Sequence, residues 1–233
     1  MSILCMILYG SCARNDNQKD SDVDIFALCD DMYYNMIIKS KINIAKYPLE
    51  LAINRAKNGD LFVLHILEEG KVIYDSSQYY QKLKSNFKYK NNYSEEIHKA
   101  TEVSCYLLSL GSSVENYFLF NKALAWCVRT ILIAKSTEQK KPLFSAKELG
   151  DFSNLSYVYD LIKSKNESTL KRKNLNNFKS FIQQHGSDDA DDLIKKIKKI
   201  KNVIDYFQSV NNYYGIKLAK KMSSGNASLN YFD

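Results

Sequence analysis

The stretch YGSCARNDNQKDSDVDIF, residues 9–26, combines the residue types that bind phosphate and a divalent cation. The apolar run over residues 3–9 ends at a Gly-Ser pair, which predicts a buried strand running into a turn. Gly10 would let a ligand approach the backbone, and Ser11 can cap the helical turn that follows. The free N–H groups of that turn and the guanidinium of Arg14 would then form a site for an anion such as phosphate.

Two aspartates, Asp22 and Asp24, stand one residue apart in a second expected strand over residues 22–28. Side chains alternate along a strand, so both carboxylates should project from the same face. Like charges this close would force one group to protonate unless a cation lies between them. Oxygen ligands of this kind suit Mg²⁺, with Mn²⁺ as a possible substitute, and substrate phosphates would complete the coordination.

This pattern resembles the DNA polymerase β-like nucleotidyltransferase superfamily, whose signature is Gly-Ser, about ten residues, and Asp-x-Asp on a strand. The likeness is closest to the minimal nucleotidyltransferase branch, in which the stretch reads GSxARGxxxxxSDxDL. Here Asn15 replaces the usual glycine, and asparagine tolerates the left-handed backbone better than other residues with a side chain. The resemblance implies that Asp22 and Asp24 hold the metal. The nucleotide-binding residues that it implies are Gly10, Ser11, Arg14 and Ser21.

The resemblance also implies a third carboxylate on a later strand, as the base for the attacking hydroxyl or as a further metal ligand. Glu50 is the candidate, because it lies in PLELAI, residues 48–53, where apolar neighbours favour a strand. A solvent-facing glutamate on an edge strand would give the same pattern. The catalytic interpretation depends mainly on the resemblance.

The remaining elements of the first half follow from local patterns. We expect a helix over residues 31–46, a second helix over 60–69 and a strand over 71–75. The resemblance covers roughly residues 2–76. We therefore predict an α+β protein, in which a small mixed β-sheet with flanking helices forms a nucleotidyltransferase domain over residues 1–92.

Beyond residue 92 the apolar spacing becomes helical, which predicts an all-α helical bundle over residues 93–222 and a flexible tail over 223–233. One helix should begin at Ser94, a second should span 114–134, and a last long helix should carry apolar residues from 193 to 207. This domain resembles the helical partner domain shared by kanamycin nucleotidyltransferase and HEPN proteins. No histidine follows Arg129 by four to six residues as in HEPN ribonucleases, which argues against ribonuclease activity.

The distribution of charge and the spacing of the cysteines further restrict which classes of protein the chain can belong to. Residues 1–92 hold 12 basic and 11 acidic side chains, whereas 93–233 hold 21 and 15. The lysine-rich run 195–201 could bind tRNA, another nucleic acid or an acidic protein, but a solvated helix face is the favoured interpretation. Five cysteines without paired spacing argue against a zinc site or a disulfide framework. No signal peptide and no membrane-spanning run is evident, so we expect a cytoplasmic protein without membrane contact.

The resemblance implies transfer of a nucleoside monophosphate from a nucleoside triphosphate, with ATP as the expected donor, to an acceptor hydroxyl with release of pyrophosphate. A small antibiotic, a protein and a tRNA remain open as acceptors, and the architecture is compatible with a homodimer. A template-independent polymerase acting on RNA ends is the second enzyme class. The non-enzymatic alternative is a catalytically degenerate nucleotidyltransferase fold, acting as a nucleotide-binding or toxin–antitoxin partner module. Retention of Asp22 and Asp24 argues against that alternative, and an incorrectly placed Glu50 would favour it.

Overall fold

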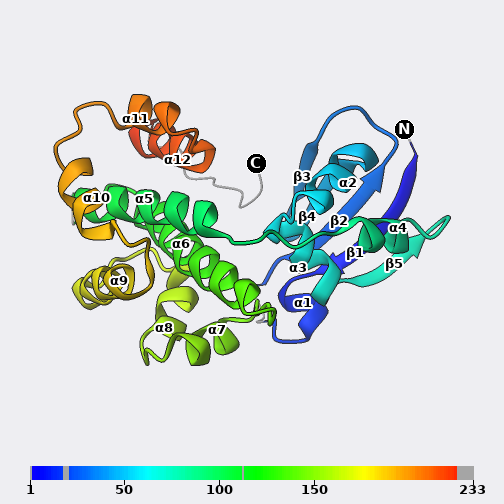
Figure 1. Ribbon diagram of the computed structural model, residues 1–233, viewed down its shortest axis with the longest axis horizontal. Helices are drawn as coiled ribbons and strands as arrows, with labels where there is room; N and C mark the ends of the chain where they lie inside the picture. The colour runs from blue at the N-terminus through cyan, green and yellow to red at the C-terminus, as the bar shows by residue number, and fades with distance from the viewer. Residues whose placement is uncertain (1, 18–20, 112, 225–233) are drawn as a thin grey trace. The chain divides into compact units, whose positions relative to one another are not determined.

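The computed structural model of the 233-residue chain describes residues 2–17, 21–111 and 113–224 (Figure 1). It divides into two compact units, with the boundary between Asn91 and Asn92. The first unit combines a mixed sheet with helices, and the described part of the second unit is helical without strands. The fold class is therefore α+β, as the sequence predicts.

A five-stranded sheet with the order β3-β4-β2-β1-β5 organises the first unit. Its strands are β1 (Ile3–Tyr9), β2 (Val23–Cys29), β3 (Asn35–Lys39), β4 (Ile42–Pro48) and β5 (Lys71–Asp75). β1 pairs antiparallel with both β2 and β5, whereas β2 and β4 run parallel. The structure confirms the strands predicted at residues 3–9 and 71–75, and it confirms the one at 22–28 to within a residue.

Helices cover one face of this sheet. The helices of the first unit are α1 (Ser11–Arg14), α2 (Leu49–Lys57), α3 (Leu61–Glu69) and α4 (Tyr79–Asn86). Ile7, Phe26 and Tyr47 of the sheet share a buried cluster with Ile53 of α2 and Ile66 of α3. Burial of such side chains stabilises the fold by about 1.5–3 kcal/mol for each large apolar residue. The packed face therefore holds β1, β2 and β4 in fixed register.

Two predicted secondary-structure elements of the first unit are wrong. Residues 31–46 do not form a helix; β3 and β4 form an antiparallel pair there, with Ile37 opposite Ile44. β-branched residues such as these fit a pleated strand better than a helix. Residues 48–53 do not form a strand, because α2 begins at Leu49 and buries Ala52, Ile53 and Ala56 on one helical face.

The prediction of a helix over residues 60–69 is confirmed by α3. Asp60 stands at its N-cap and accepts hydrogen bonds from the backbone N–H groups of Phe62 and Val63, each at 3.0 Å. An aspartate at this position satisfies donors that the first helical turn leaves without partners. The start of α3 is thus encoded locally.

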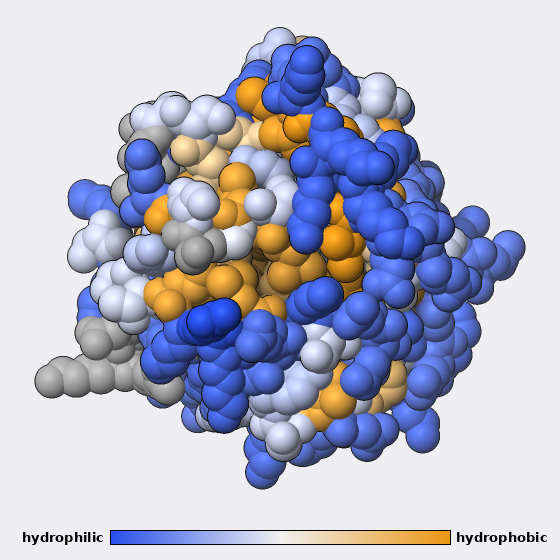
Figure 2. Space-filling view, turned by 90° about the vertical axis from the view of Figure 1, so that its left-hand side faces the viewer, coloured by the Kyte–Doolittle hydropathy of each residue, from blue (hydrophilic) through white to orange (hydrophobic). Residues whose placement is uncertain are grey.

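Two long helices, α5 (Ser94–Leu110) and α6 (Tyr117–Glu138), pack against each other at the centre of the second unit. The shorter helices are α7 (Ala146–Ser153), α8 (Val158–Lys163), the 3₁₀ turn η1 (Ser164–Asn166), α9 (Arg172–His185), α10 (Ala190–Ile197), α11 (Val203–Ser209) and α12 (Tyr213–Ser224). Figure 2 looks onto the side of this unit that carries α9, α10 and α11, where apolar surface is rimmed by hydrophilic side chains. The predicted start at Ser94 is confirmed, and α6 begins three residues later than predicted.

The last long helix predicted through residues 193–207 is wrong, because the chain forms two separate helices there, α10 and α11, and a third, α12, follows. The side chain of Asn202 accepts hydrogen bonds from the N–H groups of Ile204 and Asp205 and so begins α11. Asn211, with φ 53°, then separates α11 from α12. Asparagine favours such caps and left-handed positions. Of the predicted tail, residues 223 and 224 belong to α12, and residues 225–233 lie outside the described part of the chain.

Helix α6 is relevant to the prediction that the protein makes no contact with a membrane. In the described ranges it is the one helix with the length and apolar composition to cross a bilayer, and 61% of its apolar window is buried inside the structure. The core helix of a water-soluble protein has the same properties, so α6 is weak evidence for a membrane. The structure places it in the core of the second unit.

A buried carboxylate joins three helices of the second unit. Glu102 of α5 is 1% exposed and accepts hydrogen bonds from Tyr206 Oη of α11 at 2.6 Å and from Asn212 Nδ2 at 2.9 Å. Asn212, just ahead of α12, also donates to the carbonyl of Lys99, and its Oδ1 accepts from the N–H of Gly215 at 3.0 Å. Since an ionised carboxylate is costly to bury without donors, these contacts fix how α11 and α12 pack on α5.

Candidate functional site

The Gly-Ser corner begins where β1 ends. Gly10 has φ 74°, and its carbonyl accepts from the N–H groups of Ala13 and Arg14, both at 3.1 Å, which closes the short helix α1. The expectation that Ser11 caps this turn is wrong, because Gly10 is the N-cap and no side chain caps it. Asn15, with φ 62°, adopts the left-handed conformation that its place in the motif predicts.

Asp24 lies beside this corner. It pairs with Tyr9 in the antiparallel register of β1 and β2, and its Oδ2 lies 3.3 Å from where a Cβ on Gly10 would stand. A side chain at residue 10 would therefore occupy the space next to the carboxylate. The structure brings Asp24 and Gly10 together, as the sequence predicts.

Asp22 immediately precedes β2 and is exposed. Its backbone carbonyl accepts a hydrogen bond from Cys12 Sγ at 3.3 Å, which places the Asp22 backbone beside α1. Ser21 is half-buried next to it. The part of the chain that the structure describes contains no group of three His, Cys, Asp or Glu side chains close enough to hold a metal. That Asp22 and Asp24 project from the same face of the strand stays a prediction, because Asp22 lies just ahead of β2; the two carboxylates would be the protein ligands of a divalent cation whose other ligands come from water and substrate.

Asn43 of β4 occupies the neighbouring strand position. In the parallel register of β2 and β4 it lies opposite Asp24, and its Nδ2 donates to Asp24 Oδ1 at 3.0 Å. Both side chains are half-buried. Sequence reasoning missed Asn43, because residues 31–46 were expected to be helical; the alternation of INIAKYP was the available signal.

Glu50 lies at the other end of the sheet. It is an exposed residue in the first turn of α2, which follows Pro48, and Pro48 lies opposite Cys29. The five steps along the strand from Asp24 to Cys29 span about 16 Å at roughly 3.3 Å per residue. The structure does not bring Glu50 to the aspartates.

Arg14 is held by two carboxylates. Its Nε donates to Asp16 Oδ2 at 3.1 Å and its Nη1 donates to Glu69 Oε2, while His65 Nε2 lies 2.8 Å from the same Glu69 oxygen. Burial acts to raise the pKa of Glu69, but the hydrogen bond and charge of His65 and the charge of Arg14 outweigh it and lower that pKa. Sequence reasoning missed His65 and Glu69, although their four-residue spacing places them on one face of a helix.

Tyr9 closes the inner side of the site. It is 1% exposed, and its ring meets those of Phe62 and His65 edge-on, at centroid distances of 5.6 and 5.7 Å. Burial first, and then the charge of Asp24, raise the pKa of Tyr9 well above its usual value. The hydroxyl therefore keeps its proton at neutral pH.

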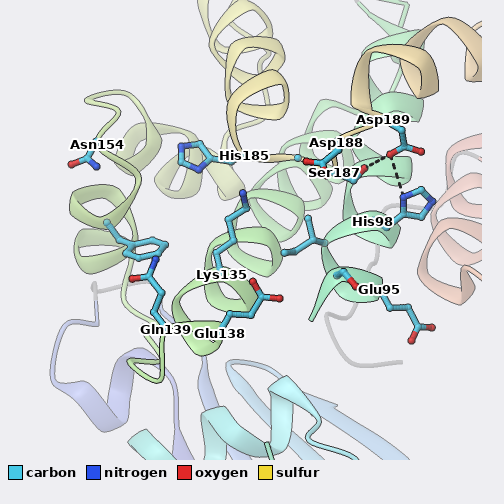
Figure 3. A pocket seen from close by; sticks show the side chains of 14 residues that line it. Glu95, His98, Lys135, Glu138, Gln139, Asn154, His185, Ser187, Asp188 and Asp189 are labelled. Atoms are coloured by element: carbon cyan, nitrogen blue, oxygen red, sulfur yellow. Dashed lines mark hydrogen bonds and ion pairs between the residues drawn. The ribbon is translucent and has the colours of Figure 1, made fainter. Parts of the chain in front are cut away.

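The second unit has a cavity of its own, of about 1210 Å³. Figure 3 shows Lys135 and Glu138 projecting from α6, His185 at the end of α9, and His98 of α5 linked to Asp189 at 3.4 Å. Burial and the charge of Lys135 lower the pKa of His185. His185 Nε2 lies 3.1 Å from a backbone carbonyl, which can only accept, so this nitrogen carries the proton. The cavity can bind a polar molecule and contains more acidic than basic groups.

The comparisons with known proteins concern the first unit. Residues 1–79 match the family described as Polymerase beta, Nucleotidyltransferase. A search of curated proteins gave no significant match. The matched residues contain the Gly-Ser corner, both aspartates, Asn43 and all five strands. The match supports placing the first unit in the DNA polymerase β-like nucleotidyltransferase superfamily.

Proposed function

We propose that the protein transfers a nucleoside monophosphate from a nucleoside triphosphate to a hydroxyl group on a separate acceptor and releases pyrophosphate. The observation that carries this proposal is the position of Asp24 Oδ2 directly against Gly10, at the end of the strand pair that contains the Asp-x-Asp motif. The family match over residues 1–79 supports it. ATP is the donor we favour.

In this proposal Asp22 and Asp24 hold a magnesium ion, with manganese as a substitute. When bound, that ion would neutralise charge on the triphosphate and orient it for in-line attack. Gly10 leaves the space in which the phosphates can approach Asp24. Ser11, Ser21 and the α1 backbone would position the phosphates.

Arg14 would attract the phosphates less strongly than an arginine whose charge is not compensated within the protein. Its guanidinium is already paired with Glu69 and Asp16, so part of its positive charge is compensated within the protein. A group that is held in place needs less reorganisation when charge develops on a substrate. Arg14 therefore contributes a fixed, partly neutralised donor near the corner.

The deprotonation of the acceptor hydroxyl is not assigned to Glu50 in this proposal, because Glu50 lies at the far end of β4. Asn43, the residue opposite Asp24, cannot accept a proton at neutral pH. These two observations favour a second candidate function, in which the domain binds a metal–nucleotide complex without transferring the nucleotide.

One experiment separates the two candidates and identifies the acceptor. The protein is incubated with Mg²⁺ and ATP, CTP, GTP or UTP labelled at the α-phosphate, in the presence of tRNA, lysate protein or aminoglycosides. We expect label in one of these pools, and none with Asp24→Asn. Asp151→Asn, at an exposed aspartate of the second unit, is the matched control and should label as the wild type does. Nucleotide binding without label in any pool would support the binding module instead.

A further inference from the structure

The cavity of about 1210 Å³ in the second unit is lined by residues of α5, α6, α7 and α9 and of the segment that leads into α10 (Figure 3). Sites for small molecules typically have volumes of about 300–1,000 Å³. The cavity therefore has room for a small molecule together with water. Ile97, which is 8% exposed, and the half-buried Phe152 give it an apolar part.

Lys135 supplies the positive charge of the cavity. It is half-buried on α6, and within residues 2–17, 21–111 and 113–224 it forms no ion pair and no side-chain hydrogen bond. Glu138, three residues further along α6, has a spacing that often allows an ion pair, but its Oε1 accepts from the backbone N–H of Tyr93 at 2.6 Å. An ammonium group that is partly removed from water is stabilised by an anionic partner. A ligand with a carboxylate would provide that partner.

His185 adds a hydrogen-bond acceptor to the same cavity. Burial first, and then the charge of Lys135, lower the pKa of His185, so its ring is neutral at neutral pH. Nε2 carries the proton, because it lies 3.1 Å from the carbonyl oxygen of Ser153. Nδ1 is then left with a lone pair. His185 can therefore accept from an N–H or O–H group of a ligand, while Lys135 binds an anionic group.

Four carboxylates also line the cavity. Two of them already meet a basic side chain of the protein: Glu95 lies 2.6 Å from Lys99, and Asp189 lies 3.4 Å from His98. The other two, Glu138 and Asp188, are exposed and form no ion pair with any residue that the structure describes. The cavity thus presents one cationic group and two anionic groups that no opposite charge of the described chain neutralises.

We propose that this cavity binds a small zwitterion of the amino-acid class, whose carboxylate is held by Lys135 and whose ammonium group is held by Glu138 and Asp188. A simple anion would be repelled by the two acids and a simple cation by Lys135, whereas a molecule with both charges gains at both ends. A polyanion such as a nucleic acid or a nucleoside triphosphate is disfavoured for the same reason. Every lining residue belongs to the second unit, so this binding does not depend on nucleotidyl transfer.

The test measures binding to the full chain by isothermal titration calorimetry, without nucleotide or metal. The probes are glycine, γ-aminobutyrate and ε-aminocaproate, which are zwitterions of increasing length. Caproate and hexylamine are the singly charged analogues. We expect saturable binding of at least one zwitterion, about tenfold or more tighter than either analogue, because each analogue lacks one charge-assisted hydrogen bond. The same zwitterion should raise the melting temperature.

Two variants assign the ends of the ligand. Lys135→Met keeps the length of the side chain and removes its charge, and should weaken binding of the zwitterion and of caproate about tenfold or more without weakening that of hexylamine. Asp188→Asn should weaken binding of the zwitterion and of hexylamine but not of caproate. The matched controls are Lys179→Met and Asp151→Asn, at exposed residues of α9 and α7 that do not line the cavity, and both should bind as the wild type does.

Lys135→Met should fold, because it replaces a half-buried cation by an apolar side chain; if it does not, Asp188→Asn, at an exposed residue, still tests the proposal. Absence of saturable binding by all three zwitterions would overturn the proposal. Caproate or hexylamine binding as tightly as the best zwitterion would also overturn it, since one charge would then suffice. Zwitterion binding at the wild-type affinity in both folded variants would place the site elsewhere on the chain and reject the assignment to this cavity.

Discussion

Arg14, in α1, is ion-paired with Glu69, in the last turn of α3 and 55 residues further along the chain. The pair joins the loop that follows β1 to a helix of the packed layer. The side chains are 18% and 13% exposed, so the contact is largely shielded from solvent. It therefore both anchors the Gly-Ser corner and compensates the charge that the sequence assigned to phosphate binding.

Replacing Glu69 by glutamine should destabilise the protein. Arg14 would lose the more buried of its two carboxylate partners and keep Asp16, so the loss should be below the about 3–5 kcal/mol that breaking a fully buried pair costs. The free energy of unfolding from urea denaturation, followed by circular dichroism, gives the value. Glu68→Gln, at the exposed neighbouring glutamate, should change stability by less than about 0.5 kcal/mol. Equal stabilities of the two variants would contradict a structural role for the pair.

The same pair should give an acid-dependent loss of stability. The pKa of Glu69 is lowered in the folded protein from its ordinary value of 4.5, so the unfolded chain binds this proton more readily. The contribution is therefore complete above pH 4.5 and is lost as pH falls through the lower folded pKa. Unfolding free energies measured between pH 7 and pH 3 should fall more steeply for wild type than for Glu69→Gln. Parallel curves would show that the carboxylate is not stabilised by folding.

Gly10→Ala and Gly111→Ala together should distinguish two effects of an added Cβ: backbone strain, which lowers stability, and loss of the space beside Asp24, which lowers ligand binding. Gly10 and Gly111 both have positive φ, 74° and 57°, so alanine at either position should cost about 1 kcal/mol of stability. A Cβ at residue 10 would lie 3.3 Å from Asp24 Oδ2, whereas nothing lies within 4 Å of one at residue 111. We expect Gly10→Ala alone to weaken Mn²⁺ and nucleotide binding, measured by calorimetry. Equal loss of binding in both variants would mean that the space beside Asp24 is unimportant.

Tyr206→Phe should destabilise the second unit. Burial and the hydrogen bond to Glu102 raise the pKa of Tyr206, and its loss would leave the buried carboxylate short of a donor. A missing hydrogen bond to a charged group costs about 1.5–3 kcal/mol. Trp126, the one tryptophan of the chain, lies in α6 and reports unfolding by its fluorescence. Tyr213→Phe, at a tyrosine that is 72% exposed, should leave the midpoint unchanged.

The sequence predicted the corner and the strands on which it depends, because their signals are local. An apolar run before Gly10 and alternation after Asp22 suffice for β1 and β2, and Asp60 encodes the start of α3. The interval between β2 and α3 could not be predicted in the same way. Isoleucines at short spacing fit either a helix face or a strand, and the pairing of β4 with β2 is a long-range contact that decides between them.

The wrong prediction of a strand over residues 48–53, which contain Glu50, followed from the same difficulty in the segment between β2 and α3. Shifting the strand six residues earlier, from 48–53 to 42–48, exchanges a carboxylate for the amide of Asn43 at the place beside Asp24. The ion pair of Arg14 with Glu69 was equally hidden, since nothing in the sequence joins residues 55 apart. The last helices show the opposite case, in which apolar spacing alone predicts one helix and the asparagine caps divide it.

The most direct test of nucleotidyl transfer at this site is the rate of pyrophosphate release from nucleoside triphosphates with Mg²⁺ and the pooled acceptors. Wild type and Asp151→Asn should release pyrophosphate at the same rate. Asp22→Asn and Asp24→Asn should be slower by several orders of magnitude, because each would remove a ligand of the proposed ion that neutralises the phosphates. Release by Asp24→Asn at the wild-type rate would contradict the account.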